Sequence, residues 1–197
     1  MNLLQVTEEL KSAELLLKKY KNNVTIFGSA RTSKKDNALI QATNLGRILS
    51  DKGFNILTGG GPGVMEAANK GAFEGKSASI GLNIKLEHEQ HPNPYLDEVI
   101  LFNHFFTRKH SMMNYSVAFV CFPGGFGTGD ELLEILTLIQ TNKIAKVKVF
   151  LYGTEFWKPI ITWFKDLEKI KFVNSDYLNY LYFVDSISQI VNEVEKE

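Results

Sequence analysis

The feature that most constrains the fold of this sequence is a repeated pattern: a short apolar run, then glycine, then a segment with helical spacing. The apolar runs and the glycines that follow them are residues 24–27 and Gly28, residues 55–58 and Gly59–Gly63, and residues 118–122 and Gly124–Gly127. Short, continuously apolar strands are typical of a sheet that is covered on both faces. In such sheets ligands bind beyond the carboxyl ends of the strands. We therefore expect the three glycine segments to gather at one edge of a sheet.

The rest of the chain continues this alternation of strands and helices. It predicts an α/β, three-layer, Rossmann-like fold with a mostly parallel sheet flanked by helices. Further strands are expected at 79–84, 99–102, 147–152 and 182–184, and helices at 1–20, 37–52, 62–74, 107–116, 128–142, 156–169 and from about 186. Asp185-Ser186 is a good N-cap for the last helix. The length predicts one domain over residues 1–197, with residues 1–21 as an N-terminal helical extension.

Charge and cysteine content exclude several classes of protein. The 22 Lys and Arg residues balance the 22 Asp and Glu residues, so the formal net charge is zero. A nucleic-acid or membrane partner held by charge needs a basic field or patch, and we expect neither partner. A lone cysteine forms no internal disulfide. No apolar run approaches the roughly 18 residues of a membrane-spanning helix. Without a targeting segment, the expected localisation is cytoplasmic.

The two larger glycine clusters point to an anion site. Glycines let the backbone approach a ligand closely, and the next helix offers unpaired N–H groups and the positive end of its dipole. A single such loop could equally be a tight turn that needs positive φ, but two loops at strand ends favour a phosphate or nucleotide site. Neither loop is a standard motif, because the Walker lysine and the G-x-G-x-x-G spacing are both missing.

The charged residues beside the loops each allow two interpretations. Glu131 lies three residues after Thr128, which is the spacing of a capping box at a helix start. Alternatively, Glu131 and Glu134 face a cation or a positively charged transition state. The pair Arg108-Lys109 is either solvated or directed at an anionic partner. The positive end of the helix dipole disfavours a cation at a helix start, and this favours an anionic partner for the pair.

Other polar residues favour structural roles. Asp130 and Glu66 occupy first helical turns, where the dipole alone favours an acid. His88 and His91 lie three residues apart, but nearby prolines predict a loop, so we expect no metal site. Cys121 lies inside an apolar strand and is expected to be an inert, buried thiol.

Three motifs, in order along the chain, resemble those of one known family. Residues 123–131 read P-G-G-F-G-T-G-D-E and resemble the signature P-G-G-x-G-T-x-x-E. Residues 59–69 are similar to that family's other glycine motif, and residues 106–109 with Met112 resemble its Arg-Lys segment. The family is LOG ("lonely guy"), the cytokinin riboside 5′-monophosphate phosphoribohydrolases that were long mislabelled as lysine decarboxylases. The resemblance runs from about residue 24 to residue 144, with features of the longer bacterial branch.

The resemblance implies hydrolysis of the N-glycosidic bond of a nucleoside 5′-monophosphate, giving a free base and ribose 5-phosphate. It implies that Arg108 and Glu131 are catalytic, with no cofactor and no metal. A carboxylate beside C1′ stabilises an oxocarbenium-like transition state and activates water. The expected substrate-binding residues are Gly28, Ser29, Gly60, Gly61, Met65, Glu66, Lys109, Gly124, Gly125, Phe126, Gly127, Thr128 and Asp130. One position departs from the signature, since Gly129 replaces a bulkier apolar residue.

The sequence is compatible with more than one substrate and more than one oligomeric state. AMP and N6-substituted AMP, such as a cytokinin riboside monophosphate, differ only at N6, and no residue decides between them. An alternative is a non-catalytic nucleotide or molybdenum-cofactor carrier of the same fold, and a nucleotide-sensing regulator is a third possibility. The presence of both Arg108 and Glu131 favours the enzyme. The resemblance also implies a homodimer or a higher homo-oligomer with sites near the subunit interface.

Overall fold

A computed structural model describes residues 2–86 and 91–196 and contains one seven-stranded sheet. The strand order is β4-β3-β2-β1-β5-β6-β7, and every neighbouring pair is parallel. The strands are β1 (Asn23–Phe27), β2 (Asn55–Thr58), β3 (Ser79–Ile84), β4 (Glu98–Phe102), β5 (Ala118–Cys121), β6 (Lys148–Tyr152) and β7 (Leu181–Val184). The predicted three-layer α/β fold with a parallel sheet is thereby confirmed.

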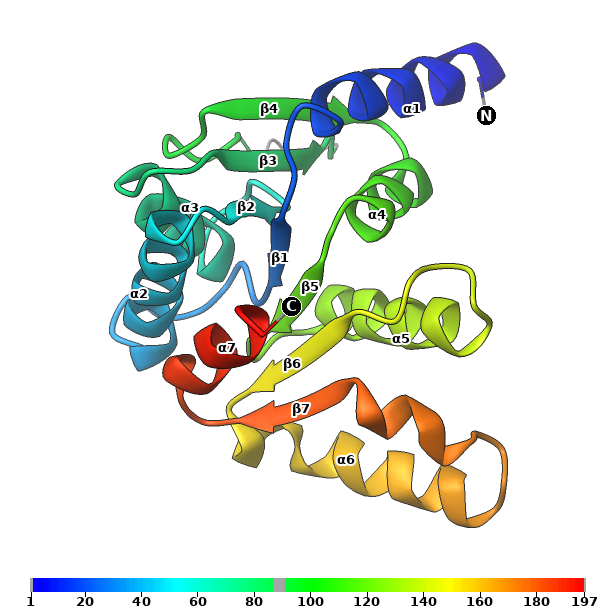
Figure 1. Cartoon of the computed structure of the whole chain (residues 1–197). Coiled ribbons are helices and arrows are strands. Elements are labelled where there is room, and N and C mark those ends of the chain that lie inside the picture. The colour runs from blue at the N-terminus through cyan, green and yellow to red at the C-terminus, as the bar shows by residue number, and fades with distance from the viewer. Residues whose placement is uncertain (1, 87–90, 197) are drawn as a thin grey trace.

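Helices cover both faces of this sheet (Figure 1). One face packs against α1 (Leu3–Leu17), α4 (Phe105–Asn114), α5 (Phe126–Gln140) and α6 (Thr154–Lys169). The other packs against α2 (Asn37–Asp51), α3 (Val64–Phe73) and α7 (Ile187–Val194). Successive strand residues alternate between the two cores, as in β5, where Phe119 faces one and Val120 the other. Both faces are therefore apolar, which explains the continuous apolar runs of the sequence.

The chain reverses its direction across the sheet between β1 and β5. It builds β2, β3 and β4 on one side of β1 and then returns to place β5, β6 and β7 on the other side. At this switch point the segments after the two strands diverge into opposite layers, which leaves a crevice at the carboxyl edge. Hydrogen bonding between the segments that follow β1 and β5 continues past the strand ends, where Ser29 N donates to Pro123 O at 3.1 Å. The fold thus brings Gly28 and Gly124 together.

Element boundaries differ from the expected ones in a few places. The helix expected from residue 62 begins at Val64, because Gly63 (φ 71°, ψ −129°) is not helical. The helix expected from residue 128 begins at Phe126. A short 3₁₀ helix, η1 (Ser175–Asn179), was not predicted. Ser186 is the N-cap of α7 as expected, accepting a hydrogen bond from Ser188 N.

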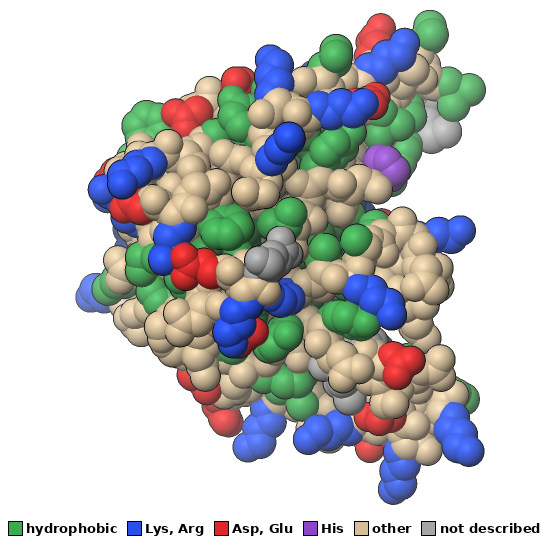
Figure 2. Space-filling model, in the orientation of Figure 1, with side chains coloured by type: hydrophobic (Ala, Val, Ile, Leu, Met, Phe, Trp, Pro, Cys, Tyr) green, Lys and Arg blue, Asp and Glu red, His purple; other side chains and the backbone are tan. Residues whose placement is uncertain are grey.

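The surface mixes charges of both signs. On the face shown in Figure 2, the Lys and Arg side chains are interspersed with Asp and Glu, in keeping with the zero net charge. Within residues 2–86 and 91–196, none of the helices combines the length and the apolar character needed to span a bilayer.

Candidate active site

A cleft of about 570 Å³ opens at the carboxyl edge of the sheet, where β1 and β5 end. Its walls come from the segment after β1, from the first glycine loop, from α4 and from the start of α5. The lining residues are Phe27, Gly28, Ser29, Ala30, Arg31, Gly59, Met65, Arg108, Gly125, Phe126, Gly127, Thr128 and Glu131. The cleft therefore lies at the topological switch point, where an open α/β sheet binds its ligands.

Arg108 and Glu131 form a buried ion pair in the wall of this cleft. Arg108 Nη2 donates to Glu131 Oε1 at 2.8 Å, joining α4 to α5. The two residues are 9% and 8% exposed. The Arg108 guanidinium also lies over the Phe105 ring, 5.3 Å from its centroid. Among the described residues, nothing pairs with the buried Nε atom of Arg108. An unpaired buried donor is costly, and this atom lacks the partner that a buried N–H group usually has.

Burial is the largest influence on the pKa values of both groups in this pair. It raises the pKa of the Glu131 carboxyl to about 7, against the opposing charge of Arg108. Burial also lowers the pKa of the Arg108 guanidinium, and here the charge of Glu131 opposes it. An acid–base group works best when its pKa lies near the operating pH. Glu131 is thus a buried carboxyl whose pKa lies near neutral pH.

Lys109 points to a different set of partners from its neighbour Arg108. Its Nζ atom lies 2.8 Å from Asp130 Oδ2 and 2.6 Å from Glu134 Oε2. This second bridge also joins α4 to α5. The two acids that α5 carries besides Glu131 therefore face a cation of the protein itself, and Lys109 is not among the residues that line the cleft.

The N-terminus of α5 is open to the cleft. Its N-cap is Gly125, which has no side chain to cap the helix. Thr128 is therefore inside the first turn and Glu131 in the second, so the capping-box interpretation of these two residues is wrong. Gly125, Phe126 and Gly127 are exposed, and a Cβ added at Gly125 or Gly127 would meet no atom within 4 Å. The first turn of α5 thus borders open space at Gly125 and Gly127.

The first glycine loop is closed by contrast. Gly59, Gly60 and Gly61 are buried. Thr58 Oγ1 accepts a hydrogen bond from Gly60 N at 2.8 Å, and Asn93 N donates to Gly60 O at 2.8 Å. Further bonds reach the loop carbonyls from asparagine side chains, and the first amide of α3 donates to Ser29 O at 3.1 Å. Polar groups of this loop are therefore already hydrogen-bonded within the protein.

The structure brings together most, but not all, of the expected site residues. Those in the cleft lining are Gly28, Ser29, Met65, Arg108, Gly125, Phe126, Gly127, Thr128 and Glu131. Those outside it are Gly60, Gly61, Glu66, Lys109, Gly124 and Asp130. Glu66 lines a neighbouring cavity of about 360 Å³, which shares Ala30 with the cleft. Gly124 lies behind the lining, where an added Cβ would fall 2.2 Å from Thr128 Oγ1.

Sequence reasoning missed four lining residues: Phe27, Ala30, Arg31 and Gly59. Of these, Arg31 is the chemically significant one, because it brings an exposed positive charge to the cleft. The available signal was its place three residues after Gly28, at the end of a strand that was already assigned to the ligand edge.

The remaining candidates lie apart from the cleft. Cys121 is buried and unpaired, and burial raises the pKa of its thiol. His88 lies outside the described residues, so the structure says nothing of the His88–His91 pair. Within the described parts of the chain, no three His, Cys, Asp or Glu residues are grouped so that they could hold a metal ion.

Comparison with known proteins identifies the family of this chain. The family model described as "Possible lysine decarboxylase" matches residues 65–194. The chain belongs to the LOG family. It is 27% identical over 177 residues to the pyrimidine/purine nucleotide 5′-monophosphate nucleosidase of Escherichia coli (strain K12), covering 83% of this chain and 38% of that protein. It is also 27% identical over 176 residues to the cytokinin riboside 5′-monophosphate phosphoribohydrolase LOG of Oryza sativa subsp. japonica, covering 88% and 72%.

This LOG-family chain spans less than two fifths of the length of the Escherichia coli nucleosidase. Solved structures also share its fold, with a TM-score of 0.68 and 20% identity to the molybdenum cofactor binding protein of Rippkaea orientalis, over 89% of this chain and 96% of that one. The Moco carrier protein of Chlamydomonas reinhardtii gives a TM-score of 0.66 at 24% identity, over 89% and 96%. At such identities the likeness shows the fold alone.

Proposed function

We propose that the chain hydrolyses the N-glycosidic bond of a nucleoside 5′-monophosphate, releasing the free base and ribose 5-phosphate. The observation that carries this proposal is the buried Arg108–Glu131 pair, which lies in the same cleft as the open N-terminus of α5. Membership of the LOG family and the names of the relatives in Escherichia coli and Oryza sativa support the same reaction.

The substrate phosphate binds at the start of α5. The amides of Phe126, Gly127 and Thr128 are the first of the helix and have no intrahelical acceptor, so they suit an anion. Glycine at positions 125 and 127 leaves the space that a phosphate needs. Arg31 adds an exposed positive charge on the opposite wall, contributed by the segment after β1. Binding energy from the phosphate then contributes to catalysis at the distant C1′ atom.

The reacting bond lies beside Glu131. Breaking the bond between C1′ and the base nitrogen builds positive charge on the ribose ring. The Glu131 carboxylate stabilises that charge and takes a proton from the attacking water, whose oxygen becomes the C1′ hydroxyl. Arg108 holds the carboxylate by its Nη2 atom, and its positive charge lies in the wall of the same cleft. The departing base takes up a proton, so that AMP and water give adenine and ribose 5-phosphate.

Product analysis by chromatography tests this proposal. AMP, adenosine, N6-isopentenyl-AMP and the other nucleoside monophosphates are incubated with the wild type and with Glu131→Gln. We expect base release from at least one monophosphate, little from adenosine, and a loss of about 10³-fold or more in Glu131→Gln, because an electrostatic group at the reacting centre is removed. Glu155→Gln, the same change at an exposed site on α6, is the control and retains full activity. Tight binding of nucleotide without base release contradicts the hydrolase and favours a carrier or a regulator.

We also propose a homo-oligomer that acts in the cytoplasm and releases a cytokinin base when its substrate carries an N6 substituent. The support for assembly is exposed apolar surface: Phe126, in the lining of the cleft, is 100% exposed, and Phe105 and Phe106, at the start of α4, are 52% and 49% exposed. Exposed aromatic groups of this kind mark interaction surfaces. Light scattering of the purified chain gives its mass directly. A monomer at all concentrations contradicts the assembly and leaves the reaction untouched.

A further inference from the structure

The N-terminal helix α1 carries a buried carboxylate that the proposed reaction does not use. Glu9 is 6% exposed, although its neighbour Glu8 is exposed. Its Oε1 atom accepts hydrogen bonds from Asn103 N at 2.8 Å and from Asn103 Nδ2 at 3.0 Å. Its Oε2 atom accepts a hydrogen bond from the Thr107 hydroxyl, and His104 Nδ1 lies 3.2 Å from both oxygens. A buried carboxylate is costly unless it is bonded, and this one is fully engaged.

All of these donors belong to the start of α4. The N-cap of this helix is His104, whose own side chain makes no capping hydrogen bond. Glu9 instead bonds to the backbone just before the N-cap, at Asn103, and to the side chains of His104 and Thr107. Its negative charge also complements the positive end of the α4 dipole. Burial raises the pKa of the Glu9 carboxyl, but the bonds from Thr107, Asn103 and His104 outweigh it and hold that pKa at about 2. The carboxyl is therefore ionised at neutral pH.

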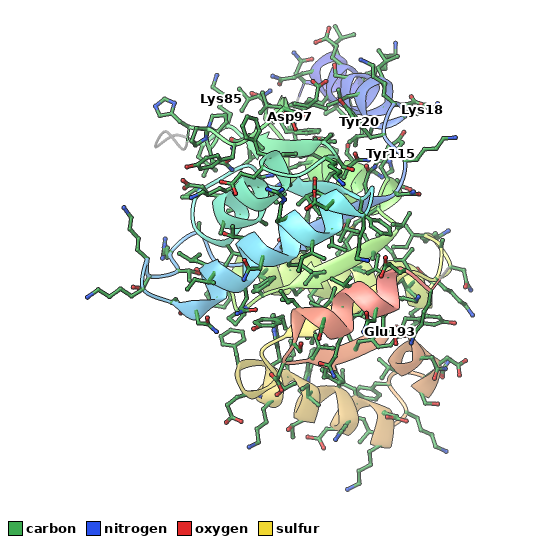
Figure 3. The ribbon with its side chains drawn as sticks, turned by 60° about the vertical axis from the view of Figure 1, so that its left-hand side comes forward. Lys18, Tyr20, Lys85, Asp97, Tyr115 and Glu193 are labelled. Atoms are coloured by element: carbon green, nitrogen blue, oxygen red, sulfur yellow. The ribbon has the colours of Figure 1, made fainter. Side chains whose placement is uncertain are left out.

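A second contact fixes α1 against the same part of the sheet. The Tyr20 hydroxyl donates to Glu98 Oε1 at 3.0 Å, and Figure 3 shows Tyr20 just below α1, toward the sheet edge. Glu98 begins β4 and Asn103 follows its last residue, so contacts from the N-terminal segment hold both ends of this strand. The extension is thus bound at two points and is part of the packed domain.

The start of α4 determines where the proposed catalytic arginine lies. Thr107, which donates to Glu9, directly precedes Arg108, which reaches Glu131 at 2.8 Å. A displacement of 1 Å in a catalytic group can cost about 10²-fold in rate. The contact with Glu9 and the contact with Glu131 are thus made by adjacent residues of α4.

We propose that Glu9 is a positioning residue, whose carboxylate binds the start of α4 from the N-terminal helix and thereby holds Arg108 in place against Glu131. The inference rests on the proposed hydrolase function, because Arg108 acts there. It makes the N-terminal extension a part of the active-site framework.

Kinetics of Glu9→Gln tests this role, with Glu8→Gln as the matched control one residue earlier on the same helix. Both are assayed well below their melting temperatures. We expect Glu9→Gln to lower kcat about tenfold with less than a twofold change in KM, and Glu8→Gln to leave both unchanged. In an Arg108→Lys background, Glu9→Gln should cost less than twofold more, because residues that act through one another are not additive. An unchanged kcat, or the same loss in both backgrounds, overturns the proposal.

A spectroscopic measurement separates this proposal from the proposed function. The Nε–H signal of Arg108 in a nitrogen–proton NMR spectrum is identified by its absence in Arg108→Lys. We expect it to move in Glu9→Gln and to stay in Glu8→Gln. If the wild type releases no base from any nucleotide, the proposed function fails, and this signal still decides the positioning role: an unmoved signal overturns it. If Glu9→Gln does not fold, Thr107→Val removes the bonding hydroxyl at nearly constant shape and is measured in the same two ways.

Discussion

The loops at residues 59–63 and 124–127 have the same sequence design, in which glycines connect a buried strand to a helix, yet the structure gives them opposite characters. Gly59–Gly61 of the first loop are buried, the adjacent Thr58 binds the amide of Gly60, and asparagine side chains from distant segments bind carbonyl groups of the loop. The second loop is exposed, its helix has no side-chain cap, and two of its glycines border empty space. The first therefore shapes the wall of the cleft, and the second offers its amides to a ligand.

The contrast shows that glycine serves two different physical needs. In the first loop, Gly60 and Gly63 have φ values of 67° and 71°, which side-chain-bearing residues rarely adopt. In the second loop, none of the glycines has positive φ, so conformational freedom is not the reason for them. There the missing side chain matters because it leaves room for another molecule.

Substitution of Gly63 should give the largest effect. Its backbone (φ 71°, ψ −129°) is a glycine conformation, and an added Cβ would lie 2.3 Å from Ser29 O. We expect Gly63→Ala to lower the free energy of unfolding by about 3 kcal/mol, measured by urea denaturation. Gly125→Ala is the control and should cost less than about 1 kcal/mol, since its Cβ meets nothing. Equal losses in the two variants would break the comparison.

Asn69 tests the polar network that closes the first loop. Its side chain accepts hydrogen bonds from the Thr58 hydroxyl and from Asn93 Nδ2, and it donates to Ser79 Oγ at 2.9 Å. Asn69→Ala leaves these buried groups unpaired, so we expect a loss of about 2 kcal/mol in unfolding free energy. Asn192→Ala, at an exposed site on α7, should have little effect. A stable Asn69→Ala chain would mean that the glycines alone keep the loop closed.

The pH dependence of the reaction tests the role of Glu131, which lies on the helix that follows the second loop. Burial raises the pKa of Glu131 to about 7, and the proposed reaction uses the ionised form. We expect kcat/KM to rise about tenfold per pH unit below pH 7 and to level off above it, because kcat/KM follows the pKa values of the free enzyme. Phosphorus NMR of the free substrate gives the separate titration of its phosphate. A kcat/KM that is constant from pH 5 to pH 8 would show that Glu131 does not titrate in this range.

The same pKa makes a prediction about stability. A carboxyl whose pKa is higher in the folded state than the usual 4.5 stabilises that state while it is protonated. This contribution is complete below about pH 4.5 and is lost as the pH rises through about 7. The unfolding free energy of the wild type, relative to that of Glu131→Gln, should therefore fall across this window. A difference that stays constant would contradict the raised pKa.

Arg31 should give the smallest effect. It is exposed at the mouth of the cleft, where solvent screens its charge. We expect Arg31→Ala to raise KM for AMP about fivefold with little change in kcat, and the difference to shrink at high salt. Arg47→Ala removes an exposed arginine of α2 and should leave KM unchanged. An unchanged KM in Arg31→Ala would leave the phosphate to the amides of α5 alone.

Much of the fold followed from the sequence, because local patterns determine it. Alternation of apolar strands and amphipathic helices indicated the layers, and the strand-end glycines indicated the ligand edge. The states of the two loops did not follow, because long-range contacts decide them: Asn93 lies about thirty residues beyond the loop that it binds. The capping box failed for a similar reason, since Glu131 bonds to Arg108 on another helix rather than to its own helix start. Glu9 looked like any other acid of an amphipathic helix.

The most direct test of the contrast is an amide NMR titration of the labelled protein with ribose 5-phosphate. We predict that the backbone signals of Phe126, Gly127 and Thr128 shift on addition, because their N–H groups bind the phosphate. The signal of Gly60 should stay in place, since Thr58 already accepts its hydrogen bond. Shifts confined to the first glycine loop, with the signals at the start of α5 unmoved, would contradict the account. They would mean that the phosphate binds at the first glycine loop.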